Sequence, residues 1–283
     1  MSAAPKRHLG IKITAALIII CAALLLLGKY GLSVTHLEIS SARLPSAFDG
    51  FRVVQLSDLH GSSFGRGNAR LINAVAKETP DVIVLTGDFL DEGKADAELP
   101  ELETLVASLL KLAPVCYVSG NHDWASGGLE SLAELFERLG ASYLRNEYIA
   151  LERGDEHLVL AGVEDPNGHA DMLKPDELVD IINSEQPDAY VMLLGHRNYW
   201  AEKYPDLQVD IIFCGHAHGG IVRLPGLGGL FGTDAKLLPR YEDGVFRSGR
   251  YDMIVSRGLG NSVPLPRFLN TPEIISVTLR EKK

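Results

Sequence analysis

The sequence predicts an α/β fold: a four-layer α-β-β-α sandwich in which two mixed β-sheets are flanked by helices, with one transmembrane helix at the N-terminus. Three observations support this prediction. Apolar, β-branched runs alternate with amphipathic stretches, later strand-like runs follow one another without helices, and an uncharged apolar segment lies near the start. With 283 residues, 46% of them hydrophobic, the chain is long enough to bury a large core.

Five apolar runs of five or six residues carry the alternation: 51–56, 82–86, 115–119, 190–194 and 209–214. Their continuous hydrophobicity is typical of strands that are buried on both faces of a sheet. Between the runs, three segments place Leu, Ala and Val at helical spacing: 68–78, 99–110 and 129–139. Strands that alternate with helices in this way predict βαβ units and a largely parallel sheet.

The strand-like segments in the middle and at the end of the chain predict a second, more antiparallel sheet packed on the first. A short strand-like segment at 34–39 precedes the alternation, and segments 148–152 and 157–162 flank Arg-Gly-Asp, which indicates a hairpin. Segments 251–256 and 274–279 are further strands with no helix between them. Because no linker-like stretch interrupts the sequence after residue 33, we expect one folded domain at residues 33–283.

The segment 1–32 is expected to form a cytoplasmic N-terminus and a membrane anchor. Residues 13–28 are uncharged and almost wholly apolar, and Lys12 and Lys29 at the edges can snorkel, which extends the span. Three basic residues precede the run, so the positive-inside rule predicts a single pass through the cell membrane with the domain outside the cytoplasm. A cleaved signal peptide is the alternative, but the A-x-A pattern of a cleavage site is missing after the run.

The charge and cysteine content exclude two classes of protein. A formal net charge of -10 argues against electrostatic binding of nucleic acid, for which a basic face is the usual footprint. Three cysteines are too few, and odd in number, for a disulfide framework, so Cys21, Cys116 and Cys214 are expected to be free thiols. We expect a monomer without a nucleic-acid partner.

Each of the five apolar runs is followed by residue types that bind metal ions. The segments that follow are Ser57-Asp58-Leu59-His60, Gly87-Asp88, Gly120-Asn121-His122-Asp123, Gly195-His196 and Gly215-His216-Ala217-His218. In open α/β sheets the loops at the carboxyl ends of the strands converge on the ligand site. Imidazole, carboxylate and amide groups together suit Mn, Fe, Zn or Co better than calcium or an all-thiolate zinc site. The sequence therefore predicts a metal centre at these strand ends.

These motifs resemble those of the calcineurin-like metallophosphoesterases. The family's D-x-H, G-D-x-x-D-x-G, G-N-H-[DE], G-H and G-H-x-H all occur here, in order, between about residues 50 and 220. The chain is similar to the membrane-anchored bacterial subgroup also in the pair Gly219-Gly220 and in segment 256–261. That subgroup often has Gln after the paired glycines, where this chain has Ile221, so a substrate contact at that position is not carried over.

The resemblance implies a role for each matching residue. Asp58, His60 and His218 would bind a first divalent metal ion, and Asn121, His196 and His216 a second. Asp88 would bridge the two ions, which would be Mn, Fe or Zn. His122 would face the substrate as a catalytic residue and be oriented by Asp123. Two ions about 3.5–4 Å apart would share a hydroxide that attacks phosphorus, and His122 would assist the leaving group.

Three features outside the ligand set leave two interpretations each. Asp91 either caps the following loop or supports the metal site from behind. Arg197 either grips a substrate phosphate or is a solvated surface residue, which we favour. The Gly- and Leu-rich segment 224–231 is either a buried loop, which we favour, or an apolar rim that meets lipid.

The sequence thus predicts a metal-dependent hydrolase of phosphate esters, with a phosphodiester preferred. An anchored domain outside the cytoplasm suggests a lipid head group, a cell-envelope polymer or a nucleotide-derived compound as the substrate. A catalytically silent module that binds a phospho-ligand on the same fold is the alternative, as is a dinuclear amide or carboxylic ester hydrolase. The complete set of motif residues favours the phosphoesterase.

Overall fold

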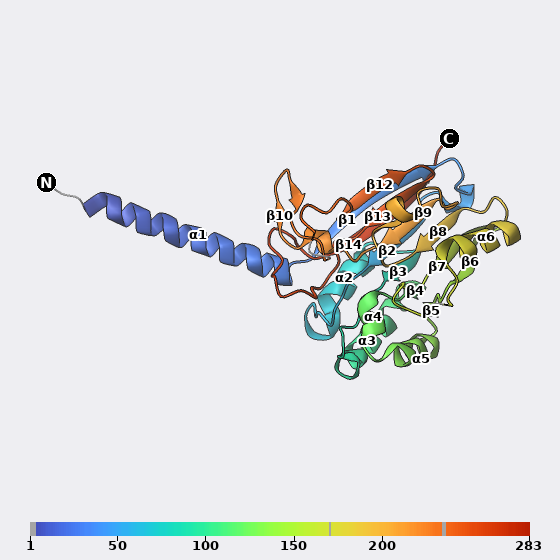
Figure 1. Ribbon diagram of the computed structural model, residues 1–283, viewed down its shortest axis with the longest axis horizontal. Coiled ribbons are helices and arrows are strands. Elements are labelled where there is room, and N and C mark those ends of the chain that lie inside the picture. Colours follow the sequence, from blue (N-terminus) through green and yellow to red (C-terminus); the bar gives the residue numbers. More distant parts are fainter. Residues whose placement is uncertain (1–3, 170, 234–235) are drawn as a thin grey trace.

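The computed structural model describes residues 4–169, 171–233 and 236–283, so that residues 1–3 of the expected cytoplasmic N-terminus lie outside the described residues. A long helix, α1 (Ala4–Tyr30), projects from one end of a domain that contains two large β-sheets (Figure 1). The predicted mixed α/β fold is confirmed, and each predicted strand corresponds to an observed one. The predicted division between the sheets is wrong for three strands: segment 274–279 lies in the first sheet, and runs 190–194 and 209–214 lie in the second.

The first sheet contains the three N-terminal apolar runs and the two ends of the domain. Its order is β1 (Ser33–Ser41), β14 (Glu273–Glu281), β2 (Arg52–Leu56), β3 (Val82–Thr86), β4 (Val115–Val118) and β5 (Ser142–Tyr143). Of its neighbouring pairs, only β14 and β2 run antiparallel. The pairing of β1 with β14 joins the start of the domain to its end over nine residues of each strand.

The second sheet is parallel at its centre and antiparallel at both edges. Its order is β12 (Gly244–Ser248), β13 (Tyr251–Val255), β9 (Ile211–Cys214), β8 (Val191–Leu194), β7 (Glu156–Gly162) and β6 (Glu147–Arg153). The edge pairs β12–β13 and β6–β7 are antiparallel. The hairpin predicted around Arg-Gly-Asp is β6–β7, and it turns through Gly154 at a φ of 65°.

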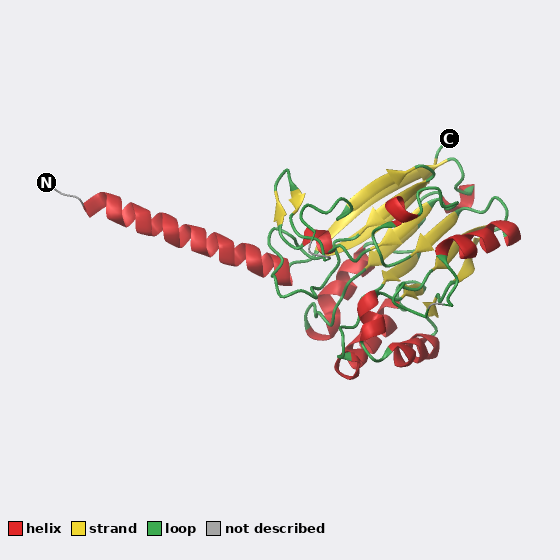
Figure 2. Ribbon diagram, in the orientation of Figure 1, coloured by secondary structure: helices red, strands yellow, loops and turns green. Residues whose placement is uncertain are grey.

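Helices cover the outer faces of both sheets, which gives the four predicted layers (Figure 2). On the first sheet lie α2 (Ala69–Lys77), α3 (Ala95–Leu109) and α5 (Leu129–Leu139), whose buried side chains pack with outward residues of β2, β3 and β4. On the second lie α6 (Pro175–Glu185) and α7 (Trp200–Lys203). A separate apolar cluster fills the space between the sheets, because alternate strand residues such as Val82 and Val84 point inward.

The shorter elements lie in the connections. Helix α4 (Asn121–Ala125) follows β4, and the two-residue strands β10 (Arg223–Leu224) and β11 (Gly228–Gly229) form a short hairpin. The 3-10 turns occupy Ser46–Phe48, Arg66–Asn68 and His218–Gly220. Helix α6 was not predicted from the sequence, although Pro175 at its first turn is a recognised start signal.

Helix α1 is long and apolar enough to cross a membrane by length and composition. The apolar span Leu9–Tyr30 has 22 residues, which is longer than the predicted 13–28 because the helix continues through both flanking lysines. Its described side chains are almost all exposed, and only Gly28 is buried against the domain. The helix therefore takes no part in the domain's apolar core.

The segment 224–231 contradicts the favoured interpretation of a buried loop. Leu224, Leu227 and Phe231 are 41%, 59% and 41% exposed, respectively. Only the base of the β10–β11 hairpin is covered, at Ile221 and Gly229. Hydrophobic composition alone did not reveal this, because strands of two residues are too short to turn a face onto the core.

Candidate metal centre

Side chains from the ends of five strands meet at one place between the sheets. The loops after β2, β3 and β4 come from the first sheet, and those after β8 and β9 come from the second. Two groups of potential ligand atoms, each within 4.8 Å of one another, are Asp58, His60 and His218, and Asp88, His196 and His216. A third group at the same spacing, His60, Asp88 and His122, includes the residue from the loop after β4. The convergence predicted from the sequence is therefore observed.

The first group is held by close contacts between nitrogen and oxygen atoms. His60 Nε2 lies 3.2 Å from His218 Nε2, and His218 Nε2 lies 3.4 Å from Asp58 Oδ1. Asp88 Oδ2 lies 3.6 Å from His60 Nε2, which joins Asp88 to this group. All of these side chains are buried.

The second group lies on the other side of Asp88. Asp88 Oδ2 is 3.1 Å from His196 Nε2, which in turn lies 3.2 Å from His216 Nδ1. The same carboxylate oxygen therefore faces a histidine of each group. This is the arrangement expected of a residue that bridges two cations.

The remaining ligand candidate, Asn121, supplies a test of whether the site fits a metal ion. Its side-chain oxygen Oδ1 is buried and has no hydrogen-bond partner among the described residues. A buried polar atom without a partner is costly, so this oxygen is suited to bind a metal ion. The Nε2 atoms of His60 and His218 also lie only 3.2 Å apart. One cation could bind both of these nitrogens, and another could bind the Asn121 oxygen.

Backbone strain is concentrated at this centre. Five of the seven candidate ligands have positive φ angles: Asp58 (53°), His60 (46°), Asp88 (57°), His216 (68°) and His218 (49°). Residues other than glycine rarely adopt this conformation, and they cluster at functional sites when the surrounding structure enforces it. The sequence pattern did not predict the strain.

Two glycines allow the loops to approach closely. A Cβ atom on Gly120 would lie 2.2 Å from Asp88 Oδ1, and one on Gly215 would lie 2.3 Å from Asp58 Oδ2. Both distances are far below van der Waals contact, so any other residue at either position would displace a candidate ligand.

Two of the four histidine rings are fixed from behind by an acceptor. Asp91 Oδ1 lies 2.8 Å from His60 Nδ1, and the Thr86 carbonyl lies 2.9 Å from His196 Nδ1. Such contacts place the proton on Nδ1 and leave Nε2 to face the centre. This contact favours the interpretation in which Asp91 holds the metal site from behind over the one in which it only caps the following loop.

The expected role of Asp123 requires a correction. Its buried carboxylate accepts hydrogen bonds from four backbone N–H groups, those of Asp88, Phe89, Leu90 and Gly120, at 2.7–2.9 Å. The carboxylate beside the His122 ring is that of Asp91, 3.8 Å from Nδ1. Asp123 therefore fixes the loop that carries Asp88, because its position within the α4 turn aims the side chain at that backbone.

The charges in the cluster are distributed unevenly. Burial raises the pKa of Asp58 and is reinforced by the charge of Asp88. Burial would also raise the pKa of Asp88, but His196 and His60 outweigh it and lower that pKa. For His196, burial opposes the charged form, yet Asp88 raises the pKa to about 10. Burial lowers the pKa of His218 and His216, which leaves both rings neutral and able to donate lone pairs.

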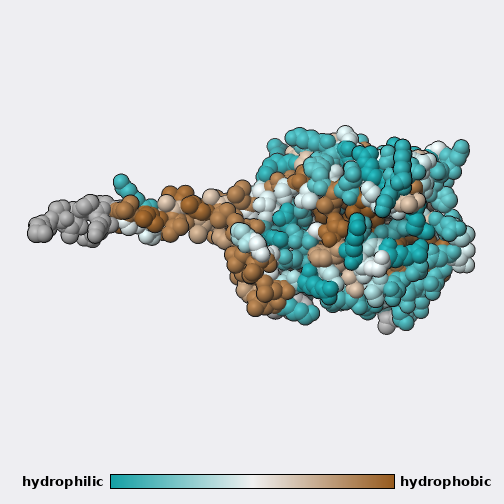
Figure 3. All heavy atoms as spheres, turned by 90° about the horizontal axis from the view of Figure 1, so that it is seen from above, coloured by the Kyte–Doolittle hydropathy of each residue, from teal (hydrophilic) through white to brown (hydrophobic). Residues whose placement is uncertain are grey.

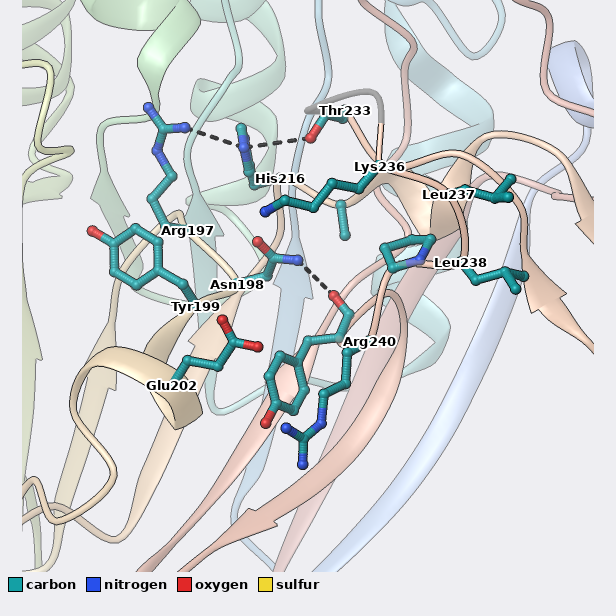
Figure 4. Close-up of a pocket in the computed structure, with 14 residues that line it drawn as sticks. Arg197, Asn198, Tyr199, Glu202, His216, Thr233, Lys236, Leu237, Leu238 and Arg240 are labelled. Carbon is teal, nitrogen blue, oxygen red and sulfur yellow. Dashed lines mark hydrogen bonds between the residues drawn. The ribbon is translucent and has the colours of Figure 1, made fainter.

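A cavity of about 410 Å³ opens beside His216 (Figure 4). Arg197 Nη1 lies 3.1 Å from His216 Nε2, and Thr233 Oγ1 lies 3.4 Å from the same atom. Arg197 also forms a two-pronged ion pair with buried Asp165, at 2.6 and 3.0 Å. The favoured interpretation of Arg197 as a solvated surface residue is thus wrong, because its guanidinium is fixed at the rim of the site.

Sequence reasoning missed Arg267, which is 4% exposed and lies next to the first group. Its Nη2 donates to the Arg257 carbonyl and lies 3.3 Å from His218 Nδ1, and burial lowers its pKa to about 10. No short motif surrounds it. The resemblance did single out segment 256–261, whose backbone bonds the Asp58 loop through Leu259 and Gly260.

Comparisons with known proteins agree with this geometry. Residues 51–220 match the model of the calcineurin-like phosphoesterase family. The uncharacterized metallophosphoesterase YkuE of Bacillus subtilis is 31% identical over 257 residues, covering 88% of this chain and 86% of that protein. A zebrafish (Danio rerio) transmembrane protein with a metallophosphoesterase domain is 28% identical over 88% of this chain and 57% of its own length.

A third relative has a more specific name. The phosphodiesterase YaeI of Escherichia coli is 26% identical over 234 residues, covering 81% of this chain and 82% of that protein. The family match spans all five motifs whose side chains converge in the structure. This chain is therefore a member of the calcineurin-like phosphoesterase family.

Proposed function

We propose that the protein is a membrane-anchored hydrolase of phosphate esters that uses two divalent metal ions. Asp58, His60 and His218 would hold one ion, Asn121, His196 and His216 the other, and Asp88 both. The observation that carries the proposal is the position of Asp88 Oδ2, which faces His60 at 3.6 Å and His196 at 3.1 Å.

The bound ions would be Mn, Fe or Zn, as the mixed nitrogen and oxygen donors suggest. Such a pair supplies an activated water for attack on phosphorus and neutralises charge on the phosphate. The protein's own residues orient the reactants. Asp123 holds the Asp88 loop through four backbone hydrogen bonds, and Asp88 Oδ1 accepts the backbone N–H of His122 at 2.7 Å.

His122 is the residue best placed to transfer a proton. Its ring is partly exposed, and its Nδ1 is buried without a hydrogen-bond partner among the described residues. The ring stands edge-on to His60, with centroids 4.7 Å apart. From this position His122 would donate a proton to the leaving oxygen, and Asp91 would stabilise the charged ring.

A phosphodiester is the preferred substrate, and the relationship to the phosphodiesterase YaeI supports that preference. Residues 1–32 would form the anchor and residues 33–283 the catalytic domain outside the cytoplasm. The 22-residue apolar span and the transmembrane relative from zebrafish support the anchor. Lys6 and Arg7 before the span, with Lys12 near its start, support this orientation.

The proposal is tested on the full-length chain in lipid nanodiscs after removal of its metal. Mn, Zn, Fe or Mg is added back, bound metal is counted per chain, and hydrolysis of a methyl nitrophenyl phosphodiester and of nitrophenyl phosphate is followed. We expect two ions per chain and metal-dependent turnover that is lost in Asp88→Asn. The matched control, Asp155→Asn, removes an exposed carboxylate from the β6–β7 turn and should have no effect.

Three outcomes would contradict the proposal. Absence of bound metal would refute the metal centre. Bound metal without turnover of either ester would favour the silent phospho-ligand module. Turnover of nitrophenyl acetate in place of the phosphate esters would indicate a carboxylic ester hydrolase.

A further inference from the structure

One end of the domain carries a group of exposed leucines and a phenylalanine that the catalytic proposal does not use. We call this group the apolar collar; its members are Leu224, Leu227, Phe231, Leu237, Leu238, Leu265 and Leu269. Each is between 38% and 66% exposed. Exposed apolar residues that gather into a patch mark a contact surface, whereas single ones do not.

The collar is continuous, because backbone contacts join its three segments. Phe231 pairs with Leu237 in an isolated bridge, and the Leu238 N–H donates to the Leu230 carbonyl at 2.9 Å. Segment 265–269 lies against the base of the hairpin, where the Arg223 N–H donates to the Phe268 carbonyl at 3.0 Å. The three segments 224–231, 237–238 and 265–269 therefore form one surface.

Helix α1 leaves the domain beside this surface. A Cβ on Gly28 would lie 2.3 Å from the Arg267 carbonyl oxygen, so the helix backbone packs directly on segment 265–269. The Arg70 side chain also donates to the Tyr30 carbonyl at 2.9 Å. Brown apolar surface continues from the helix onto the adjoining end of the domain (Figure 3).

The length of the helix sets the depth of the collar. Twenty-two helical residues extend about 33 Å, which matches the hydrocarbon thickness of about 30 Å. Lys29 and Tyr30 then fall at the boundary between lipid and water, where such residues anchor a membrane helix. Because Gly28 contacts Arg267, segment 265–269 of the collar would lie at the same boundary.

The base of the collar is tied to the metal centre by polar contacts. Arg223 donates to the Gly219 carbonyl at 2.9 Å and to Asp243 at 3.0 Å, and Gly219 directly follows the candidate ligand His218. The cavity beside His216 is bordered by Leu237 and Leu238 of the collar (Figure 4). The apolar collar thus forms one wall of the cavity.

We propose that the apolar collar inserts into the lipid interface and opens the metal centre toward phosphate esters carried by membrane lipids. Burial of its leucines fixes the domain against the bilayer, so that a lipid phosphoester can enter the cavity with its acyl chains still in the membrane. This inference rests on the proposed anchor and hydrolase, and it adds a second membrane contact and a substrate class.

Spin labels on the full-length chain in phosphatidylcholine vesicles test the insertion. Cys21→Ser provides the background, because Cys116 and Cys214 are buried and burial raises the pKa of both thiols. Single labels replace Leu227 and Leu265 in the collar. Leu17 in α1 reports the anchor, and Ile181, 39% exposed on α6 away from α1, is the matched aqueous control. The measurement compares label accessibility to oxygen and to a nickel chelate.

Labels at Leu227 and Leu265 are expected to favour oxygen, as the label at Leu17 does, while the label at Ile181 favours nickel. A buried label at Leu17 with aqueous labels at Leu227 and Leu265 would overturn the collar and leave the anchor intact. An aqueous label at Leu17 would overturn the anchor and, with it, the collar.

Turnover tests the substrate class with two esters that share a leaving group. A hexadecyl nitrophenyl phosphodiester in vesicles is compared with its water-soluble methyl analogue, using Leu224→Ser/Leu227→Ser, which changes the hairpin outside the cavity wall. We expect turnover of the hexadecyl ester to fall several-fold and that of the methyl ester to stay unchanged.

Equal effects of the double substitution on both esters, or no effect on either, would overturn the proposal that the substrate enters the cavity from the membrane. Failure of the unmodified protein to hydrolyse either ester would refute the hydrolase, while the labels still decide the insertion.

Discussion

The carboxylate oxygen Oδ1 of Asp91 lies 2.8 Å from Nδ1 of His60, on the side of the ring that faces away from Asp88 and His218. An acceptor in this position keeps the proton on Nδ1 and turns the Nε2 lone pair toward the centre. Asp91 thus determines which nitrogen of His60 can bind a metal ion.

Replacement of Asp91 by Ala should weaken metal binding by about 10–100-fold, because the His60 ring loses its orientation and part of its basicity. The affinity is measured by titration of the metal-free protein against a chelator. Glu92→Ala is the matched control, since it removes a neighbouring exposed carboxylate. Equal affinity in the two variants would refute the assigned role of Asp91.

The stability of the metal-free protein should depend on pH through Asp91. Its hydrogen bond from His60, with that from Lys94, outweighs burial and lowers the pKa of Asp91 to about 2 from an ordinary 3.8. A lowered folded-state pKa contributes stability that is fully present above about pH 4 and is lost as pH falls toward 2.

We expect the unmodified protein to have a higher free energy of unfolding than Asp91→Asn at pH 5. This stability difference should be about 1 kcal/mol smaller at pH 2, a figure that allows for solvent screening of the exposed Lys94. Urea unfolding in detergent at several pH values measures the difference. A difference that stays constant with pH would contradict the assignment of the shift to Asp91.

Replacement of His122 by Ala should act on the leaving group. For a phosphodiester with an alkoxide leaving group, kcat should fall by about 10²–10⁴-fold, because that oxygen needs a proton. For a nitrophenolate leaving group the loss should be much smaller. The metal content should not change, and His157→Ala, which removes an exposed imidazole, should leave both rates intact. Equal losses for the two leaving groups would exclude a proton-transfer role.

Replacement of Gly120 by Ala should remove the metal rather than unfold the protein. Its Cβ would lie 2.2 Å from Asp88 Oδ1 and 2.5 Å from the Asp88 nitrogen, so the bridging carboxylate must move. Overpacking of this kind costs about 1–3 kcal/mol. Gly93→Ala is the control: its φ is 66°, but no atom lies within 4 Å of the added Cβ.

The Gly93 control should lose about 1 kcal/mol of stability through backbone strain and keep its metal. Metal counts per chain and thermal unfolding separate the two effects. Full metal occupancy in Gly120→Ala would show that Asp88 tolerates the displacement and is not bound as proposed.

Much of the fold could be predicted because its strands are marked locally. The predicted run 82–86 is β3 to the residue, and predicted helix 129–139 is α5. Helix α6 was not predicted because its apolar residues are few and are interrupted by many polar ones. Strand β5 has only two residues, which is too short to show an alternation of apolar and polar residues. The prediction that segment 224–231 is buried was wrong, because composition does not show which apolar residues are covered by other elements.

The sequence alone determined which strands carry the candidate ligands. Five buried strands are each followed by Asp, Asn or His at a fixed spacing, and this pattern predicts both the ligand types and their convergence. Only the tertiary structure decided how those groups act on one another. It assigned Asp91 to His60, turned Asp123 onto the backbone of the Asp88 loop, and paired Arg197 with Asp165. These contacts join residues that are distant along the chain. Their geometry depends on the packing of the two sheets and on strained loop conformations, which no local pattern encodes.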